Sequence, residues 1–370
     1  MKHSILRKLM LIAVLLTSSH AFAYDFEVDG IYYNLLNLSE LTCGVTYKNN
    51  DYNSYSGDIT IPETVCYKNK MLKVVSIGYE AFRDCKNLTS LIVGDSINII
   101  DQYAFYNCCN LINISIPKSV TRIDAYAFNG CNSLKELNIE DGPDVLSLEE
   151  CSYSHTYNGW TTTYVCGLFY NNPIEKVYLG RNLKYDVAPF WDSLNRNGNA
   201  NIKEVIIGNS VTHIKSNIFY KCSGLNTITI GSSVTTIDNS SFSNCTSITT
   251  IYSLNSIPPT GVNFENSVYI NATLYIPFRS MSLYQSAAGW KNFWDIQEAL
   301  SCIESTLSND VTVSVENGNI VINGVIDNEN VGVYNVNGQC VYSGTATTIP
   351  VNTKGLYIVK VNNKTFKVML

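Results

Sequence analysis

The side chains of this chain that could do acid–base or metal chemistry are few, and their spacing matches no catalytic motif. His155 and His213 are the only histidines after residue 23, and neither begins an H-E-x-x-H zinc motif. A Ser-His-Asp triad would have to use one of them, yet the sequence contains no G-x-S-x-G elbow. Phosphate-binding G-x-G-x-x-G and G-x4-G-K loops are also absent from the sequence.

Paired carboxylates could come from Asp141, Asp144, Glu149 and Glu150, which follow one another closely. Glycosidase carboxylates face each other across a cleft, whereas acids this close in one loop are generally solvated. We therefore expect no enzyme activity, no metal site and no cofactor.

Twelve cysteines make disulfide formation the next chemistry to consider. Cys151 and Cys166 bracket an inserted segment and are the best disulfide candidates, while Cys43 with Cys66 is a weaker pair. Five others recur at one repeat position, where side chains of stacked repeats keep β-carbons about 4.8 Å apart, against roughly 3.8 Å in a bridge. We expect buried thiols at these five positions: Cys85, Cys108, Cys131, Cys222 and Cys245.

These cysteines belong to a pattern, I-x4-F-x2-C-x2-L, that ends in a short L-x-x-I-x-I strand. The copies begin at Ile77, Ile100, Ile123, Ile214 and Ile237. Adjacent copies are 23 residues apart. Two degenerate copies, through Phe169 and Phe190, fill the middle, which gives about seven turns.

Burial in a coil explains this pattern. Leu91 and Val93 alternate with Ile92, so the first two point inward and Ile92 points outward. One turn cannot bury its apolar face alone, so neighbouring turns must stack. The sequence predicts a mainly β fold with few short helices: a right-handed leucine-rich-repeat solenoid, followed by a small C-terminal antiparallel β-sandwich.

The repeat is similar to the BspA-like class of bacterial leucine-rich repeats, whose unit is I-x-x-x-A-F-x-x-C-x-x-L-x-x-I-x-I. Ala81, Ala104 and Ala127 supply the alanine, and Ile218 and Ser241 replace it later. The resemblance covers roughly residues 24–300, and its caps resemble Tyr24-Asp25-Phe26 with Gly30–Tyr33, and Leu274–Pro277 with Tyr284-x5-Trp290. It implies a surface or secreted adhesin-like protein that binds host or matrix proteins.

Charged residues at the outward strand positions support the stacking. Lys135, Glu175 and Lys203 form one column, and Glu136, Lys176 and Glu204 form the next. Signs alternate between consecutive repeats, so in-register parallel strands would pair opposite charges.

The first 23 residues have the features of a cleavable signal peptide. Basic residues precede the apolar stretch Leu9–Leu16, and Ala21-Phe22-Ala23 has the form of a cleavage site. Cleavage removes 3 of the 25 basic residues, which leaves 22 against 31 acidic ones, a net charge near −9. We therefore expect secretion or location at the outer cell surface, no further transmembrane segment and no nucleic-acid partner.

The leucine-rich repeat ends at about residue 301, and a different residue pattern follows. Short alternating stretches are separated by Asn317-Gly318, Asn323-Gly324 and Asn337-Gly338, and Asn-Gly between such stretches is a hairpin signal. The segment through Val333-Tyr334-Asn335, Gly355–Val361 and Lys367–Leu370 resembles the C-terminal sorting domain of type IX secretion substrates in Bacteroidota. A plain β accessory module is the alternative. The expected organisation is signal peptide 1–23, β cap 24–74, solenoid 75–300 and C-terminal domain 301–370.

Binding residues are expected on the strand face and in two insertions, near 140–168 and 181–201. The first insertion mixes aromatics with small polar residues, a composition typical of recognition loops. The candidate binding residues are Tyr153, Tyr157, Trp160, Tyr164, Tyr178, Trp191 and Tyr252. Three functions remain open: a binder of extracellular protein, a glycan-binding or nutrient-capture accessory, and a structural surface protein without a specific ligand.

Overall fold

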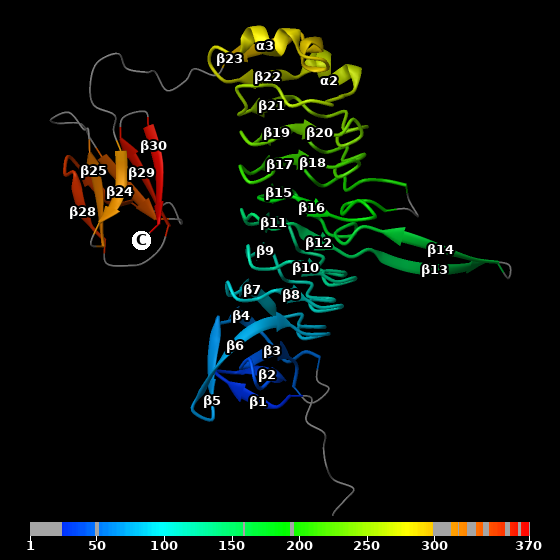
Figure 1. Ribbon diagram of the computed structural model, residues 1–370, viewed down its shortest axis with the longest axis vertical. Coiled ribbons are helices and arrows are strands. Elements are labelled where there is room, and N and C mark those ends of the chain that lie inside the picture. The colour runs from blue at the N-terminus through cyan, green and yellow to red at the C-terminus, as the bar shows by residue number, and fades with distance from the viewer. Residues whose placement is uncertain are drawn as a thin grey trace, which may run out of the picture. The chain divides into compact units, whose positions relative to one another are not determined.

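The computed structural model describes residues 24–48, 52–157, 160–192, 196–298, 312–316, 318–323, 331–335, 340–351, 356–361 and 364–369. The chain forms two compact units, with the boundary between residues 300 and 301 (Figure 1). The expected signal peptide lies outside the described residues. Among the helices of the described ranges, none is long and apolar enough to cross a membrane.

A β cap precedes the first repeat. Its strands are β1 (Phe26–Val28), β2 (Ile31–Asn37), β3 (Thr42–Thr46), β4 (Gly57–Thr60), β5 (Thr64–Tyr67) and β6 (Lys70–Ile77). The β3–β6 pairing is parallel and leads into the repeats. Tyr55 is buried, with its ring centroid 4.4 Å from that of Phe82, so the cap covers the open end of the repeat core.

The repeats stack their main strands into an eight-stranded parallel sheet. Its members are β9 (Asn113–Ile116), β11 (Glu136–Ile139), β15 (Lys176–Leu179), β17 (Glu204–Ile207), β19 (Thr227–Ile230), β21 (Thr250–Ser253), β22 (Thr273–Ile276) and β23 (Asp295–Glu298). The first repeat's strand, β7 (Leu88–Ile92), pairs with β4 of the cap. This arrangement confirms the predicted leucine-rich-repeat solenoid.

Short parallel strands run along another side of the coil (Figure 1). They are β8 (Ile99–Ile100), β10 (Arg122–Ile123), β12 (Leu146–Leu148), β16 (Leu183–Lys184), β18 (His213–Ile214) and β20 (Thr236–Ile237). β6, β8, β10, β12 and β16 are consecutive members of one sheet, while β18 pairs with β20.

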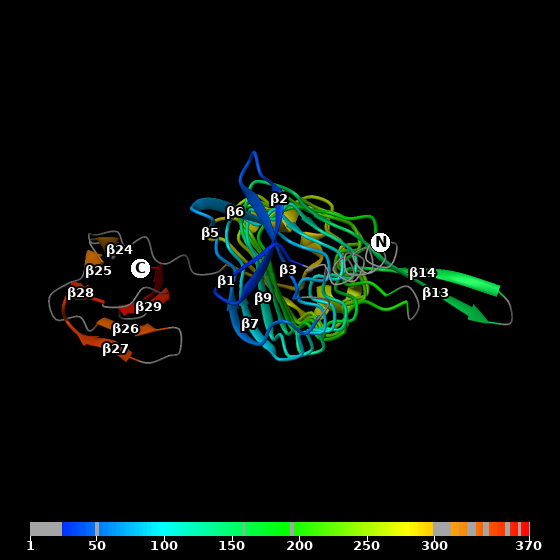
Figure 2. The same ribbon diagram turned by 90° about the horizontal axis from the view of Figure 1, so that it is seen from below.

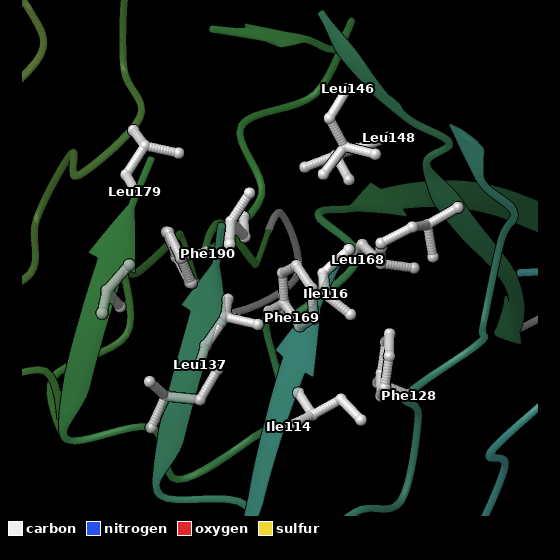
Figure 3. Packing of buried hydrophobic residues seen from close by; sticks show 14 of the residues in the cluster. Ile114, Ile116, Phe128, Leu137, Leu146, Leu148, Leu168, Phe169, Leu179 and Phe190 are labelled. Atoms are coloured by element: carbon white, nitrogen blue, oxygen red, sulfur yellow. The ribbon is translucent and has the colours of Figure 1, made fainter. Parts of the chain in front are cut away.

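A ladder of phenylalanine rings fills the interior between the strands. The stacked rings are Phe82, Phe105, Phe128, Phe169, Phe190, Phe219, Phe242 and Phe264. Neighbouring centroids lie 5.2 to 5.9 Å apart. Figure 3 shows this packing around Phe128, Phe169 and Phe190. The ring of Phe264 extends the ladder by one step beyond the seven turns expected from the motif.

The repeat cysteines hold neighbouring repeats together as thiols. Cys108, Cys131, Cys222 and Cys245 are buried free cysteines, which confirms the expectation of thiols at these positions. The Sγ of Cys131 donates a hydrogen bond to the Phe105 carbonyl of the preceding repeat, over 3.2 Å. Burial raises the pKa of Cys131 to about 12, so the thiol keeps the proton that it donates.

An asparagine takes over this role in the degenerate fourth repeat. Asn172 stands three residues after Phe169, where the five regular repeats have cysteine. Its Nδ2 donates to the carbonyl of Phe128 at 2.8 Å, the bond that a cysteine Sγ makes elsewhere. The position therefore requires a buried donor, which either side chain supplies.

The expected charge columns form ion pairs across the parallel sheet. Lys135 lies 3.2 Å from Glu175, and Lys203 lies 2.7 Å from the same carboxylate. In the neighbouring column, Lys176 and Glu204 are 3.0 Å apart. The flanking lysines lower the pKa of Glu175. These contacts confirm the register inferred from the alternating signs.

One buried cation ties repeats together at the ends of the main strands. Arg181 is fully buried, and its two terminal nitrogens donate to the carbonyls of Pro117 and Lys118, each at 2.7 Å. Burial lowers the pKa of this guanidinium.

The last repeats are closed by short helices, namely α2 (Asn266–Asn271), α3 (Met281–Ser286) and the 3₁₀ helix η1 (Trp290–Asn292). Trp290 and Tyr284 are fully buried there. The indole nitrogen of Trp290 donates to the Pro259 carbonyl at 2.7 Å, so the large ring covers the core without an unpaired donor.

The second unit contains two antiparallel sheets. One holds β24 (Thr312–Glu316), β25 (Asn319–Asn323) and β28 (Thr348–Pro350). The other holds β26 (Val331–Asn335), β27 (Cys340–Gly344), β29 (Leu356–Val361) and β30 (Lys364–Met369). Ile320 and Ile322 of the first sheet and Val331 and Val333 of the second share one buried core.

One hairpin expected in this unit is wrong. Asn323-Gly324 was expected to join two paired strands, yet β25 pairs with β24 and β28, and β26 lies in the other sheet. An Asn-Gly pair permits a tight turn but cannot force one when the apolar faces of two sheets must meet. Around Asn317-Gly318, β24 and β25 do pair as a hairpin, whereas Asn337-Gly338 lies outside the described residues.

Candidate binding surface

The first insertion is a β-hairpin that projects from the solenoid. Its strands are β13 (Cys151–Tyr157) and β14 (Trp160–Cys166), paired over seven residues from Cys151↔Cys166 to Tyr157↔Trp160. Figures 1 and 2 show it extending away from the stacked repeats. The expected loop is therefore corrected to a regular element, and residues 146–148 belong to the repeat as β12. Alternating Ser, Thr and Tyr residues in this segment favour extended pairing.

Side chains pair across the hairpin on both faces. The hydroxyls of Ser154 and Thr163 lie 3.1 Å apart, and those of Thr156 and Thr161 lie 2.9 Å apart. On the other face the rings of Tyr153 and Tyr164 stack with centroids 5.6 Å apart. Such pairs hold the backbone straight and make the hairpin a defined arm.

Two neighbouring segments fix the hairpin at its base. On the β13 side, the hydroxyl of Tyr126 accepts from the Ser152 N–H at 2.8 Å and donates to the Ser152 carbonyl. On the β14 side, the backbone of Cys166 pairs with that of Asp192 as an isolated antiparallel β-bridge. The Gly167 N–H also donates to the Trp191 carbonyl at 2.8 Å. These contacts set the direction in which the arm leaves the body.

Cys151 and Cys166 lie opposite each other at this base as buried free thiols. Burial raises the pKa of Cys151 to about 11 and that of Cys166 to about 12. The disulfide between them stays a prediction.

The weaker disulfide candidate is wrong. Cys43 of β3 and Cys66 of β5 flank β6 on its two sides, where they face Val74 and Met71 respectively. Two strand spacings separate them, beyond the roughly 7 Å between Cα atoms that a disulfide can span.

A row of tyrosines lies on the first three repeats, next to the hairpin. The ring of Tyr103 stacks on that of Tyr126 at 4.9 Å, with an interplanar angle of 8°. Tyr103 also meets Tyr79 edge-on at 6.0 Å and Tyr106 edge-on at 5.4 Å. The guanidinium of Arg83 lies 5.4 Å from the Tyr106 ring. We call these residues, together with Tyr153, Trp160 and Tyr164 of the hairpin, the tyrosine surface.

Sequence reasoning missed this row, although the signal was present. Tyr103 and Tyr126 directly precede the repeat alanine, and Tyr106 directly follows the repeat phenylalanine. Both flanking positions point outward because the Ala-Phe pair between them is buried. Comparing outward positions on the phenylalanine side, and not only on the strand face, would have found the row.

Trp191 borders a separate hollow of about 320 Å³ on the other side of the hairpin. Val165 of β14, Tyr185 and Tyr220 contribute its other apolar walls, and Asp186 lies at its rim. The rings of Trp191 and Tyr220 are 5.2 Å apart. This hollow is large enough for one small ring or one side chain.

The remaining candidates, Tyr178 and Tyr252, lie on the strand face, in the row Ser115–Asn138–Tyr178–Ile206–Thr229–Tyr252. Tyr178 donates to the carboxylate of Asp141, and Tyr252 stacks on Tyr275 at 5.0 Å. The seven candidates thus occupy three places: hairpin, hollow and strand face. Of Tyr157 the structure describes only the backbone, opposite Trp160.

The titratable groups assemble no catalytic constellation among the described residues. His213 contacts Asp238 at 2.9 Å, and the other carboxylate oxygen of Asp238 accepts from the Ser216 hydroxyl. Bonds from Ser216 and His213 lower the pKa of Asp238, and these contacts join β18 to the segment that follows β20. In the described part of the chain no three His, Cys, Asp or Glu side chains are grouped to hold a metal.

Comparison with known families agrees with this architecture. Six copies of the BspA type leucine-rich repeat region match residues 52–165 and 197–284, more than half of the chain. The chain therefore belongs to the BspA-type leucine-rich-repeat family. No curated protein sequence matches it significantly.

Solved structures of similar proteins are also leucine-rich repeats. A Treponema pallidum leucine-rich-repeat protein is 18% identical, with TM-score 0.36, covering 67% of this chain and 88% of its own. A Bacteroides ovatus leucine-rich-repeat protein is 20% identical, with TM-score 0.28, over 75% and 89%. A leucine-rich cell surface protein of Faecalibacterium prausnitzii is 16% identical, with TM-score 0.29, over 75% and 95%.

Proposed function

We propose that this chain is a non-catalytic, secreted or surface-exposed protein that binds an extracellular protein, adhesin-like, through the tyrosine surface. One observation carries the proposal: a contiguous run of aromatic contacts extends from Tyr79 through Tyr103 to Tyr126, whose hydroxyl anchors the hairpin. Its composition is that of protein-binding surfaces, in which Tyr, Trp and Arg contribute most of the affinity.

Exposure at the hairpin supports the same proposal. Trp160 is 82% exposed at the end of the arm, and Tyr153 and Tyr164 are half-buried on one face. Exposing so much of an indole ring is unfavourable for the isolated chain, and its burial by a ligand would release roughly 2 kcal/mol or more. The surface extends over three repeats and the hairpin, which suits a protein better than a single sugar ring.

A neutral glycan is the second candidate ligand, and a specific feature favours it. The hollow beside Trp191 combines aromatic walls with the Asp186 carboxylate at its rim, a combination that can stack on a sugar ring and hydrogen-bond its hydroxyls. This site is separate from the tyrosine surface, so single substitutions distinguish the two ligands.

Location at the cell surface rests on the two ends of the chain. The expected signal peptide would direct export, and the C-terminal unit, which resembles a type IX sorting domain, would direct the protein onward to the surface. Neither assignment affects which face binds.

The test is a binding screen of residues 24–370 against matrix proteins and a glycan array in parallel. Trp160→Ala and Tyr157→Ala probe the hairpin, and Trp191→Ala probes the hollow. Trp294→Ala is the matched control, because Trp294 is 78% exposed but lies outside the tyrosine surface.

Protein binding lost in Trp160→Ala and retained in Trp294→Ala supports the proposal. Glycan binding lost in Trp191→Ala favours the second candidate. If the chain binds neither a matrix protein nor a glycan, both candidate functions are contradicted. The remaining function is then that of a structural surface protein without a specific ligand.

A further inference from the structure

The outer edge of β14 is largely unpaired in the structure. Within the described ranges β13 and β14 form a two-stranded sheet, and the one additional pairing is the bridge between Cys166 and Asp192 at the base. From Thr161 to Val165 no strand of the described chain lies alongside this edge.

The backbone groups of Thr161 and Thr163 point toward that open edge. Two residues separate Tyr157 from Trp160, so Tyr157↔Trp160 is the hydrogen-bonded closing pair and alternate pairs turn their N–H and C=O groups outward. The hydroxyl contact of Thr163 with Ser154 agrees, because side chains approach most closely in the pairs that do not exchange backbone bonds.

This edge lacks the features that natural proteins use to prevent strand pairing. Residues 151–166 contain no Asp, Glu, Lys, Arg or Pro, although 15% of the chain is charged. The hairpin register runs over seven pairs without a bulge. Thr161, Thr162 and Thr163 are exposed, consecutive β-branched residues, which favour extended structure. An uncharged, straight edge of this kind accepts another strand readily.

We propose that two copies of this chain associate by antiparallel pairing of their β14 edges, which makes a four-stranded sheet with β14 beside β14 at its centre. A two-fold axis perpendicular to the sheet requires paired residues to share a face, so the register centres on one residue. Thr163 is that residue, and Thr161 then lies opposite Val165 of the second copy. The pairing ends there because Asp192 occupies the edge at Cys166.

The charge distribution permits a second copy at this edge. The sequence has a formal net charge of −6, so copies of the body repel each other. The hairpin strands contain no Asp, Glu, Lys or Arg, and seven residues span roughly 23 Å. That length exceeds the screening distance of about 8 Å in physiological salt, so the edges can meet while the acidic bodies stay apart.

This pairing does not depend on the proposed function. It uses the β14 edge and leaves the tyrosines of the repeats exposed, while Trp160 comes to lie opposite Cys166 of the second copy. If both inferences hold, each dimer presents two ligand-binding surfaces and gains avidity on a surface that displays several ligand copies.

Sedimentation velocity on residues 24–370, from about 1 to about 100 µM, tests the pairing, because a small interface of this kind associates weakly. We expect a monomer–dimer equilibrium with no larger species. Thr163→Pro removes the outward N–H and should lower the association constant by about tenfold or more, as should Thr163→Lys, which adds like charges.

Ser223→Lys is the matched control, because it adds the same charge at an exposed position of the body and should leave the equilibrium unchanged. Thermal unfolding by circular dichroism checks that each variant folds. A wild-type chain that stays monomeric at every concentration overturns the proposal. So does a dimer that is equally stable in both Thr163 variants.

Discussion

The phenol of Tyr126 determines whether the hairpin is a fixed arm, and Tyr126→Phe isolates its contribution. The substitution keeps the ring, which stacks on Tyr103 at 4.9 Å, and removes only the hydroxyl. That hydroxyl makes two bonds to Ser152, one accepted from the N–H at 2.8 Å and one donated to the carbonyl.

Each intramolecular hydrogen bond contributes about 0.5–1.5 kcal/mol, so the loss of both should weaken the base of the hairpin by about 2 kcal/mol. Global stability should change far less, because the ladder of buried phenylalanines does not depend on this contact. Local opening then becomes about 30-fold more frequent, which hydrogen exchange measures directly.

Hydrogen–deuterium exchange with mass spectrometry on peptides covering residues 151–166 is the assay. We expect faster exchange there in Tyr126→Phe, and unchanged exchange in the strands of the main sheet. Tyr79→Phe, at the far end of the tyrosine row, is the control and should exchange like the wild type. Equal exchange of the hairpin in both variants refutes the role of Tyr126 as its anchor.

Three further predictions concern the interior. Cys131→Ala removes a buried donor and its volume, and should cost about 1–3 kcal/mol in urea unfolding, while exposed Cys66→Ala should change nothing measurable. Because the pKa of Cys131 is raised to about 12, the folded chain retains a proton that the unfolded chain releases above about pH 9. Stability should therefore fall between about pH 9 and pH 12, with a shallower slope in Cys131→Ala; a rise with pH contradicts the burial argument. Arg181→Lys keeps the charge but cannot reach both carbonyls, and should lower stability by about 1.5–3 kcal/mol in the same assay, whereas an unchanged midpoint contradicts the role of the guanidinium.

Much of the fold follows from the sequence because the repeat imposes the same constraints many times. The alternation of Leu91, Ile92 and Val93 gave the inward face, and these residues are 5%, 61% and 8% exposed. The opposite charges of Lys135 and Glu175 predicted the register of the parallel strands, because these side chains come close enough to pair only in that register. Periodic burial and charge are local signals, so they can be read without coordinates.

The binding surface was harder to predict because it depends on contacts between distant segments. Trp160 and Tyr164 were recognised from their composition, but the hairpin they occupy is anchored by Tyr126, 26 residues away from Ser152. Trp191 was expected in the second insertion, and the hollow it borders also includes Val165 of the hairpin, a proximity that the sequence does not show. Phe264 was not predicted as part of the ladder, because its repeat, like those of Phe169 and Phe190, lacks the motif cysteine. The type of a residue indicates which ligands its side chain can contact. Its neighbours depend on tertiary packing, which a single sequence does not give.

The central claim is that the tyrosine surface contacts the ligand, and an exchange footprint of the complex tests it most directly. With a protein ligand from the screen bound, hydrogen–deuterium exchange should slow in peptides covering residues 103–126 and 151–166. The strand face from β15 to β22 should exchange as in the unbound chain. Protection confined to that strand face, with an unaltered hairpin, contradicts the account.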